Sequence, residues 1–150
     1  MAYTCLFVIF LGVSHWSCGP EVPDECKTHY SQPSYERDHA FRDSYSIEKQ
    51  LIVYRCAMQR KPPEFGLAAY IAERGDKNLP IILAALKAEG DEPTKVGMFY
   101  IFEIMSQKKL LRGKPETIDQ LKQVADSMHS EVGRREARES IDRIIQYNSN

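Results

Sequence analysis

Apolar side chains recur at helical spacing from residue 47 towards the C-terminus. The first such segment begins at Ile47 and continues at steps of four, three and four residues through Leu51, Tyr54 and Met58. This spacing places the four side chains on one face of an α-helix that ends before Pro62 and Pro63. The pattern therefore predicts an amphipathic helix with one face in a core.

The rest of the chain is predicted to form five more helices. Glycines mark where helices end, while aspartate and proline residues mark where helices begin. The predicted helices cover residues 64–74, ended by Gly75; residues 76–89, capped by Asp76, with Pro80 in the first turn and Gly90 at the end; residues 92–111, capped by Asp91; a segment from Pro115 to Met128; and a charged segment after Gly133. The fold class is thus all-α, with about five to six helices.

Two of these helices differ in how much of their surface is apolar. The run from Val96 to Met105 is apolar on nearly all sides, which predicts the most buried element of the fold. The final helix carries many charges, and its apolar edge is limited to Ile141, Ile144 and Ile145. We expect it to cover the pair of helices that precedes it.

The helical region contains an internal similarity. Residues 70–73, Tyr-Ile-Ala-Glu, recur at residues 100–103 as Tyr-Ile-Phe-Glu, so that Glu73 and Glu103 hold matching places. Pro80, Leu83 and Leu86 likewise correspond to Pro115, Ile118 and Leu121. Residues 65–107 resemble HEAT-like repeats, which implies a short α-solenoid of stacked helix pairs. An irregular helical bundle is the alternative architecture.

The N-terminal segment has a different pattern. Its apolar run from Leu6 to Val13 is shorter than the roughly 20 residues that a membrane-spanning helix needs. The length fits the apolar region of a secretory signal, and Cys18 follows it between Ser17 and Gly19. We therefore interpret residues 1–17 as a signal segment.

The residues around Cys18 resemble the lipobox of bacterial lipoproteins. This resemblance implies cleavage before Cys18 and acylation of its side chain, which would anchor the protein to the membrane. His15 and Trp16 depart from the aliphatic and small residues that a lipobox usually has, and no basic residue precedes the run. A plain secretory signal, an uncleaved anchor and a buried N-terminal helix are the alternatives.

By analogy with lipoproteins, Gly19 after the candidate acylated cysteine favours the outer membrane of the bacterial cell envelope, with the domain facing the periplasm. A secreted protein is the alternative location. Residues 18–43 contain Pro20, Pro23 and Pro33, are mostly polar and show no sustained period. They are predicted to be a linker that tethers a helical domain at residues 44–150.

The chain has four cysteines. If Cys5 leaves with the signal and Cys18 carries lipid, Cys26 and Cys56 remain as an even pair in an oxidising compartment. A disulfide between them would contribute about 3 to 4 kcal/mol in the chain-entropy model. The alternative is a free thiol at Cys26 and a small apolar side chain at Cys56, because the sequence does not show whether the two side chains face each other.

The net charge and the absence of known catalytic motifs reduce the number of function classes that the sequence supports. With 20 basic and 21 acidic residues the chain has no net field for nucleic acid, so we expect no nucleic-acid partner. The sequence lacks a Gly-rich phosphate loop, His-Glu-x-x-His, Gly-x-Ser-x-Gly and paired Cys-x-x-Cys units, and we assign no catalytic residue, metal or cofactor.

Two functions stay open at this point. The first is a non-enzymatic module that binds a protein partner while a lipid anchors it to the membrane. The second is a small metal-dependent hydrolase, whose site would combine Cys26, His29 and His39 with a helical acid such as Glu73. We favour the first because stacked helix pairs present extended binding surfaces.

Overall fold

A computed structural model of the chain describes residues 21–149. The predicted signal segment and the candidate lipid-attachment residue Cys18 lie outside this range. Within it the chain forms helices and no strand. The elements are α1 (Asp24–Ser31), α2 (Ser34–Asp43), α3 (Ile47–Met58), α4 (Leu67–Glu73), the 3₁₀ turn η1 (Asp76–Asn78), α5 (Leu79–Ala88), α6 (Glu92–Gln107), α7 (Pro115–Asp126) and α8 (Glu131–Ser149). The predicted all-α fold class is confirmed.

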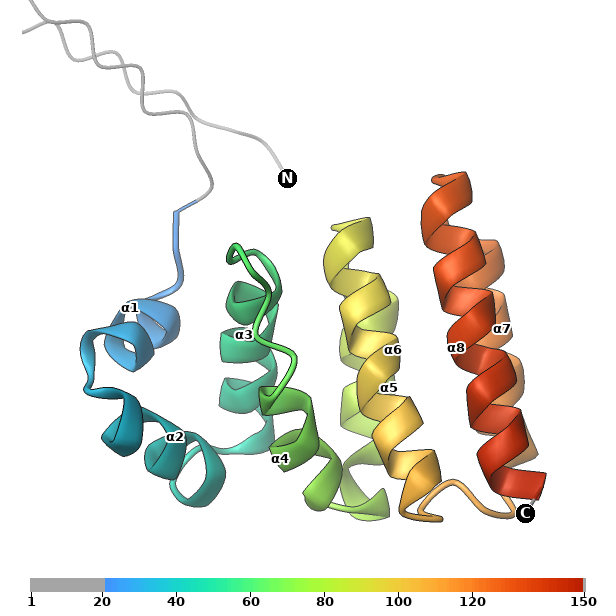
Figure 1. The fold of residues 1–150 in the computed structure, drawn as a ribbon, viewed down its shortest axis with the longest axis horizontal. Coiled ribbons are helices and arrows are strands. Elements are labelled where there is room, and N and C mark those ends of the chain that lie inside the picture. The colour runs from blue at the N-terminus through green and yellow to red at the C-terminus, as the bar shows by residue number, and fades with distance from the viewer. Residues whose placement is uncertain (1–20, 150) are drawn as a thin grey trace, which may run out of the picture.

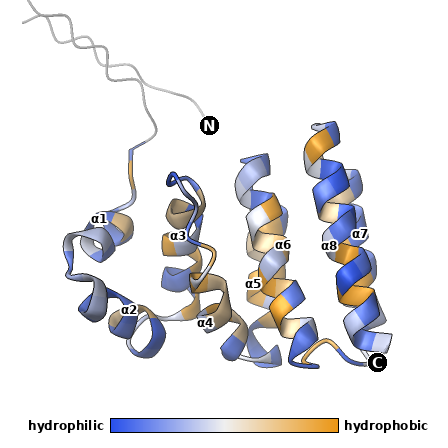
Figure 2. Cartoon of the chain, viewed as in Figure 1, coloured by the Kyte–Doolittle hydropathy of each residue, from blue (hydrophilic) through white to orange (hydrophobic). Residues whose placement is uncertain are grey.

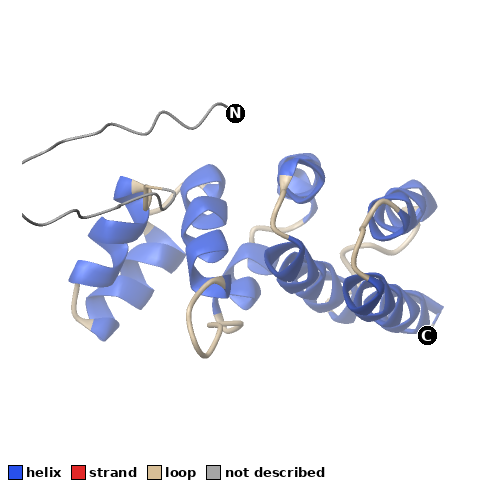
Figure 3. Cartoon of the chain, turned by 90° about the horizontal axis from the view of Figure 1, so that it is seen from above, coloured by secondary structure: helices blue, strands red, loops and turns tan. Residues whose placement is uncertain are grey.

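The helices follow one another along the long axis of the molecule, from α1 and α2 at one end to α7 and α8 at the other (Figure 1). From α3 onwards successive helices run in opposite directions. Helix α6 packs between α4 and α8, and α5 and α7 lie behind this row (Figures 1 and 3). Each helix therefore contacts mainly its neighbours in the sequence or the helix two places away.

Three predicted helix positions are confirmed. Helix α3 contains all four predicted apolar positions and ends before Pro62 as expected, and α7 begins at Pro115. Helix α6 begins directly after Asp91, whose carboxylate accepts a hydrogen bond from the backbone N–H of Thr94 at 2.9 Å. This bond satisfies one of the N–H groups that the first turn of a helix leaves free.

Other boundaries differ from the prediction. Asp76 lies in the turn η1 and does not cap α5, because its carboxylate binds Lys114 Nζ at 3.0 Å. Helix α7 ends at Asp126, and Met128 lies buried in the connection that follows. Helix α8 begins before Gly133, where a β-carbon would approach the Met128 Cε atom within 2.8 Å. Gly133 thus permits a close contact inside the helix and does not separate two helices.

The predicted linker over residues 18–43 is largely helical where the structure describes it. Helices α1 and α2 occupy most of residues 24–43 and are part of the fold. The buried side chains of α1 are Cys26 and His29, and that of α2 is Phe41. Only three positions of these helices are buried, and two of them are Cys and His. The sequence of residues 24–43 therefore shows no regular spacing of apolar residues.

The core confirms the prediction for the most buried element. Nine of the helical residues from Gly97 to Ser106 in α6 are buried, and Tyr100 is the exception. Helix α8 packs on α6 and α7 as expected, with Ile141 and Ile144 buried, although Ile145 is 37% exposed. Most of α8 is hydrophilic, with separate hydrophobic bands (Figure 2). Among residues 21–149, no helix has the combined length and hydropathy of a membrane span.

Candidate functional site

Two partly exposed aromatic residues contact each other on the surface formed by the start of α4 and by α6. Phe65 precedes α4 and is 46% exposed, and Tyr100 lies on α6 and is 38% exposed. Their rings meet edge to face, with centroids 5.8 Å apart and an interplanar angle of 83°. The neighbouring rings of Phe99 and Phe102 are fully buried, so Tyr100 is the aromatic residue of this helix that reaches solvent.

The loop that presents Phe65 is held in place by residues on both sides. Glu64 donates its backbone N–H to the carbonyl of Ala57 at 3.2 Å, which ties the loop to the end of α3. The Glu64 carboxylate binds Arg60 at 3.1 Å and accepts a hydrogen bond from the Tyr30 hydroxyl of α1 at 3.4 Å. The Arg60 guanidinium in turn lies 4.2 Å from the Tyr30 ring centroid. These contacts hold the loop that carries Phe65 against α1 and the end of α3.

An open groove of about 550 Å³ lies between α1 and α3. Val22, Tyr30, Ile52 and the sulfur-bearing residues Cys26 and Cys56 line it. The three cations at the groove are paired with carboxylates: Lys27 with Asp24, Arg55 with Glu89, and Arg60 with Glu64. Because these charges are compensated, the described residues that line the groove offer no uncompensated cation to an anionic ligand.

Cys26 and Cys56 are bonded to each other in the structure. The S–S distance is 2.03 Å and the Cα atoms are 6.4 Å apart. Of the two alternatives that the sequence left open, the structure contains the disulfide. The bond therefore links α1 covalently to α3 at one residue of each helix.

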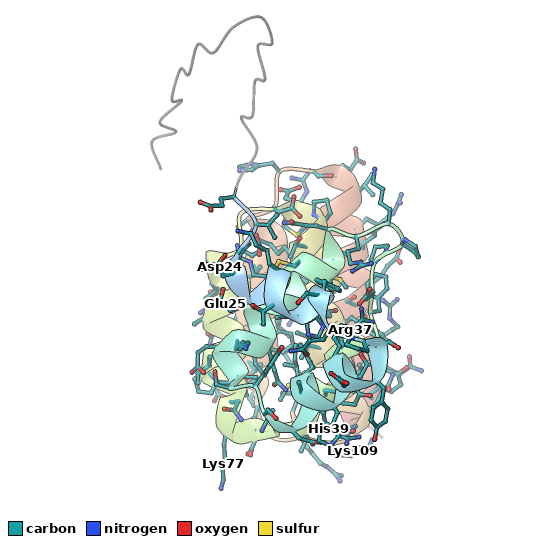
Figure 4. All side chains as sticks on the ribbon, turned by 90° about the vertical axis from the view of Figure 1, so that its left-hand side faces the viewer. Asp24, Glu25, Arg37, His39, Lys77 and Lys109 are labelled. Carbon is teal, nitrogen blue, oxygen red and sulfur yellow. A yellow bond between two sulfur atoms is a disulfide. The ribbon has the colours of Figure 1, made fainter. Side chains whose placement is uncertain are left out.

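The residues of the hydrolase alternative do not come together. Cys26 is in the disulfide, His29 is fully buried, and His39 is exposed on α2 and pairs with Asp43 at 3.3 Å (Figure 4). Glu73 pairs with Lys108 at 3.0 Å. Over residues 21–149 no cluster of three or more His, Cys, Asp or Glu side chains is arranged to hold a metal ion.

Glu103, which matches Glu73 in the internal similarity, has a different environment. It is 5% exposed and receives two hydrogen bonds of 2.9 Å from the Arg143 guanidinium. The Ser140 hydroxyl donates to the same carboxylate at 2.5 Å. The matching glutamates thus bind separate partners, and Glu103 joins α6 to α8.

Sequence reasoning did not identify the exposed aromatic pair. It placed Phe65 inside a helix of residues 64–74 and Tyr100 inside a run that is apolar on nearly all sides, and both positions then suggest burial. The one available signal was the Pro62-Pro63 pair, which keeps the following residues out of the preceding helix. The proximity of the two rings depends on how α4 packs on α6.

Comparisons with known proteins assign neither a family nor a function to the chain. No protein-family model, no curated protein and no solved structure matches the chain. The functional argument therefore starts from the residues and contacts described above.

Proposed function

We propose that the chain is a lipid-anchored protein of the bacterial cell envelope whose helical domain binds a protein partner and catalyses no reaction. The observation that carries the binding role is the exposed Phe65–Tyr100 pair. Large aromatic side chains are enriched at the energetic centres of protein interfaces, because they bury much area with little loss of side-chain entropy. Their exposure on a loop held by the contacts of Glu64 and on a helix packed between α4 and α8 supports recognition by a preformed surface.

The architecture of this module is, in our proposal, a short HEAT-like solenoid. Two features support it: successive helices alternate in direction from α3 to α8, and α6 packs between α4 and α8. Stacked helix pairs present a continuous surface built from one helix of each pair. Phe65 and Tyr100 lie on the α4 and α6 part of that surface, so a partner would contact neighbouring repeats together.

The anchor in this proposal is an acyl group on Cys18. The lipobox-like residues around Cys18 support acylation, and α1 begins only six residues later at Asp24. The domain would then lie close to the membrane, facing the periplasm from the outer membrane. Intact-mass measurement of the chain expressed in a bacterial host tests this. We expect a mass that begins at Cys18 plus acyl chains and a Cys18→Ser variant that loses them, whereas an unprocessed Met1 terminus contradicts the anchor.

Site-specific photocrosslinking tests the binding role. A photoreactive amino acid at Tyr100 is expected to give a discrete protein adduct in cells, and the same group at Tyr35 is expected to give none. Tyr35 is the matched control because it is 80% exposed on α2, away from the aromatic pair.

A competing protein shows whether the Tyr100 adduct depends on the aromatic pair. Co-expressed wild-type protein without the photoreactive group is expected to reduce the Tyr100 adduct, while a co-expressed Phe65→Ser/Tyr100→Ser variant is not. Equal adducts at both positions, or equal competition by both proteins, would contradict the proposed surface.

A further inference from the structure

His29 of α1 lies in an aromatic environment with none of its surface exposed. Its ring centroid is 4.8 Å from that of Tyr30, 5.7 Å from that of Phe41 and 5.8 Å from that of Tyr45. Within residues 21–149, neither imidazole nitrogen has a hydrogen-bond partner, and the buried Tyr45 hydroxyl has none either. A charged imidazolium here would lose its hydration without gaining an acceptor.

The charges around this site also disfavour a protonated ring. Helix α2 contributes Arg37 and Asp38, α3 contributes Lys49, and the loop after α3 contributes Arg60. Three of these four groups are cations. Burial is the main cause that lowers the pKa of His29 to about 4; Arg37, Lys49 and Arg60 add to it, and Asp38 opposes it.

The contacts of α1 and α2 with the rest of the fold are of two kinds. Helix α1 is joined to α3 by the Cys26–Cys56 disulfide, which does not break when the pH changes. Helix α2 is held by the burial of Phe41 and by hydrogen bonds to its C-terminal backbone from Gln50 and Arg74. The α2 end can thus separate while the chain stays attached at Cys26.

We propose that protonation of His29 opens the α1–α2 segment away from α3 and α4 in acid, with the Cys26–Cys56 disulfide as its pivot, while α5 to α8 stay folded. Opening would let water reach the ring, and water solvates the imidazolium better than the rings of Tyr30, Phe41 and Tyr45 do. This device depends neither on the membrane anchor nor on a protein partner. It belongs to the class of histidine switches that act through a buried, unpaired imidazole.

The direction in which pH changes the opening equilibrium follows from the difference between the pKa values of His29 in the open and closed states. An exposed histidine has a pKa of about 6.5, so the open state binds the proton first as the pH falls. Opening is independent of pH above about 7, becomes easier between about 6.5 and 4, and levels off below. From these two pKa values the opening equilibrium constant is expected to be about 30-fold larger at pH 5 than at pH 7.5.

Hydrogen exchange of the full chain, with the disulfide intact and rates corrected for intrinsic exchange, measures this opening. We expect protection of α1 and α2 peptides to fall about 30-fold from pH 7.5 to pH 5, while α6 peptides keep theirs. A His29→Phe variant keeps an aromatic ring among aromatic neighbours and is expected to lose the pH dependence. His39→Phe, at an exposed position of α2, is the control and is expected to retain it.

Two results would overturn the proposal: an unchanged pH dependence in His29→Phe, or equal loss of protection in α6 and α1–α2. If the variant does not fold, NMR titration of the wild-type imidazole decides the question. A His29 ring that titrates far below 6.5, with α1–α2 protection lost as the pH falls from about 6.5 towards that folded-state value, supports the switch. A ring that titrates near 6.5 excludes it.

Discussion

The Arg74 guanidinium, directly after α4, donates a hydrogen bond of 3.3 Å to the side-chain oxygen of Gln50, in the first turn of α3. The Gln50 amide in turn donates to the carbonyl of Phe41 at 2.5 Å. Arg74 also donates to the carbonyls of Arg42 and Tyr45, at 3.0 and 2.7 Å. Two side chains from α3 and α4 thus satisfy the backbone acceptors where the chain turns from α2 into α3.

Arg74→Ala is expected to destabilise the protein by about 1 to 3 kcal/mol, since carbonyls that now bind a charged donor lose it. Arg74→Lys is expected to restore only part of this, because an ammonium lacks the planar fork that reaches several acceptors. Urea unfolding followed by circular dichroism gives the free energies. Arg112→Ala, at an exposed position, is the control, and an equal loss in both alanine variants would contradict the role of Arg74.

The Glu103–Arg143 pair makes a second prediction. Removing Arg143 leaves the carboxylate of Glu103 buried without its cation, and such a change is strongly destabilising. Because Arg143 itself is half-exposed, we expect Arg143→Met to cost about 2 to 3 kcal/mol, near or below the lower end of the range for buried pairs. The double variant Glu103→Leu/Arg143→Met is expected to cost less than Arg143→Met alone.

A double-mutant cycle by urea unfolding checks this pair. The informative quantity is the coupling free energy between positions 103 and 143. Additive effects of the two single substitutions would show that the pair contributes no net interaction, despite its two hydrogen bonds of 2.9 Å.

Gly97 allows α6 to approach α3. A β-carbon at this position would lie 2.4 Å from Met58 Sδ and 2.9 Å from Met58 Cγ. The Gly97 carbonyl also accepts the buried hydroxyl of Tyr54 at 2.9 Å. Any side chain here must displace Met58 or separate the two helices.

Gly97→Ala is therefore expected to destabilise the protein by about 1 kcal/mol. Overpacking of a core costs about 1 to 3 kcal/mol, and the better helix propensity of alanine offsets about 1 kcal/mol of it. Gly90→Ala is the control because a β-carbon there has nothing within 4 Å. Thermal and urea unfolding of both variants decide the matter, and a stabilised Gly97→Ala protein would contradict the close packing of α3 and α6.

The helices that could be predicted from the sequence are those in which apolar residues recur at helical spacing and a capping residue marks the start. Helix α3 has four apolar residues at helical spacing, and α6 has both an apolar run and the Asp91 cap. Helices α1 and α2 could not be found in this way. Their burial depends on His29, Phe41 and a disulfide partner 30 residues away, none of which produces a local pattern.

The candidate site was less predictable than the fold. An apolar residue in an amphipathic pattern is expected to be buried, and neither Phe65 nor Tyr100 differs from buried neighbours in type. Their exposure follows from where the loop after α3 meets α6. The pairing of Glu103 with Arg143 likewise depends on the packing of helices whose residues are 40 positions apart.

Glu92 supplies the last prediction, because it caps a helix other than its own. It lies in the first turn of α6, and its carboxylate accepts hydrogen bonds from the backbone N–H groups of His129 and Ser130, the latter at 2.9 Å. These residues immediately precede α8. The bonds from His129 and then Ser130 lower the pKa of Glu92 below its usual value, since they favour the charged form.

An acid whose pKa is lowered in the folded state stabilises that state above its unfolded pKa of about 4.3, and this contribution is lost as the pH falls through the folded value. Glu92→Gln is therefore expected to weaken the start of α8 at pH 7, with several-fold faster amide exchange at His129 and Ser130. The difference from wild type shrinks below pH 4. Glu131→Gln, at the same helix end but without these bonds, is the control, and an equal effect in both variants would assign the stabilisation to the α8 dipole and not to the Glu92 cap.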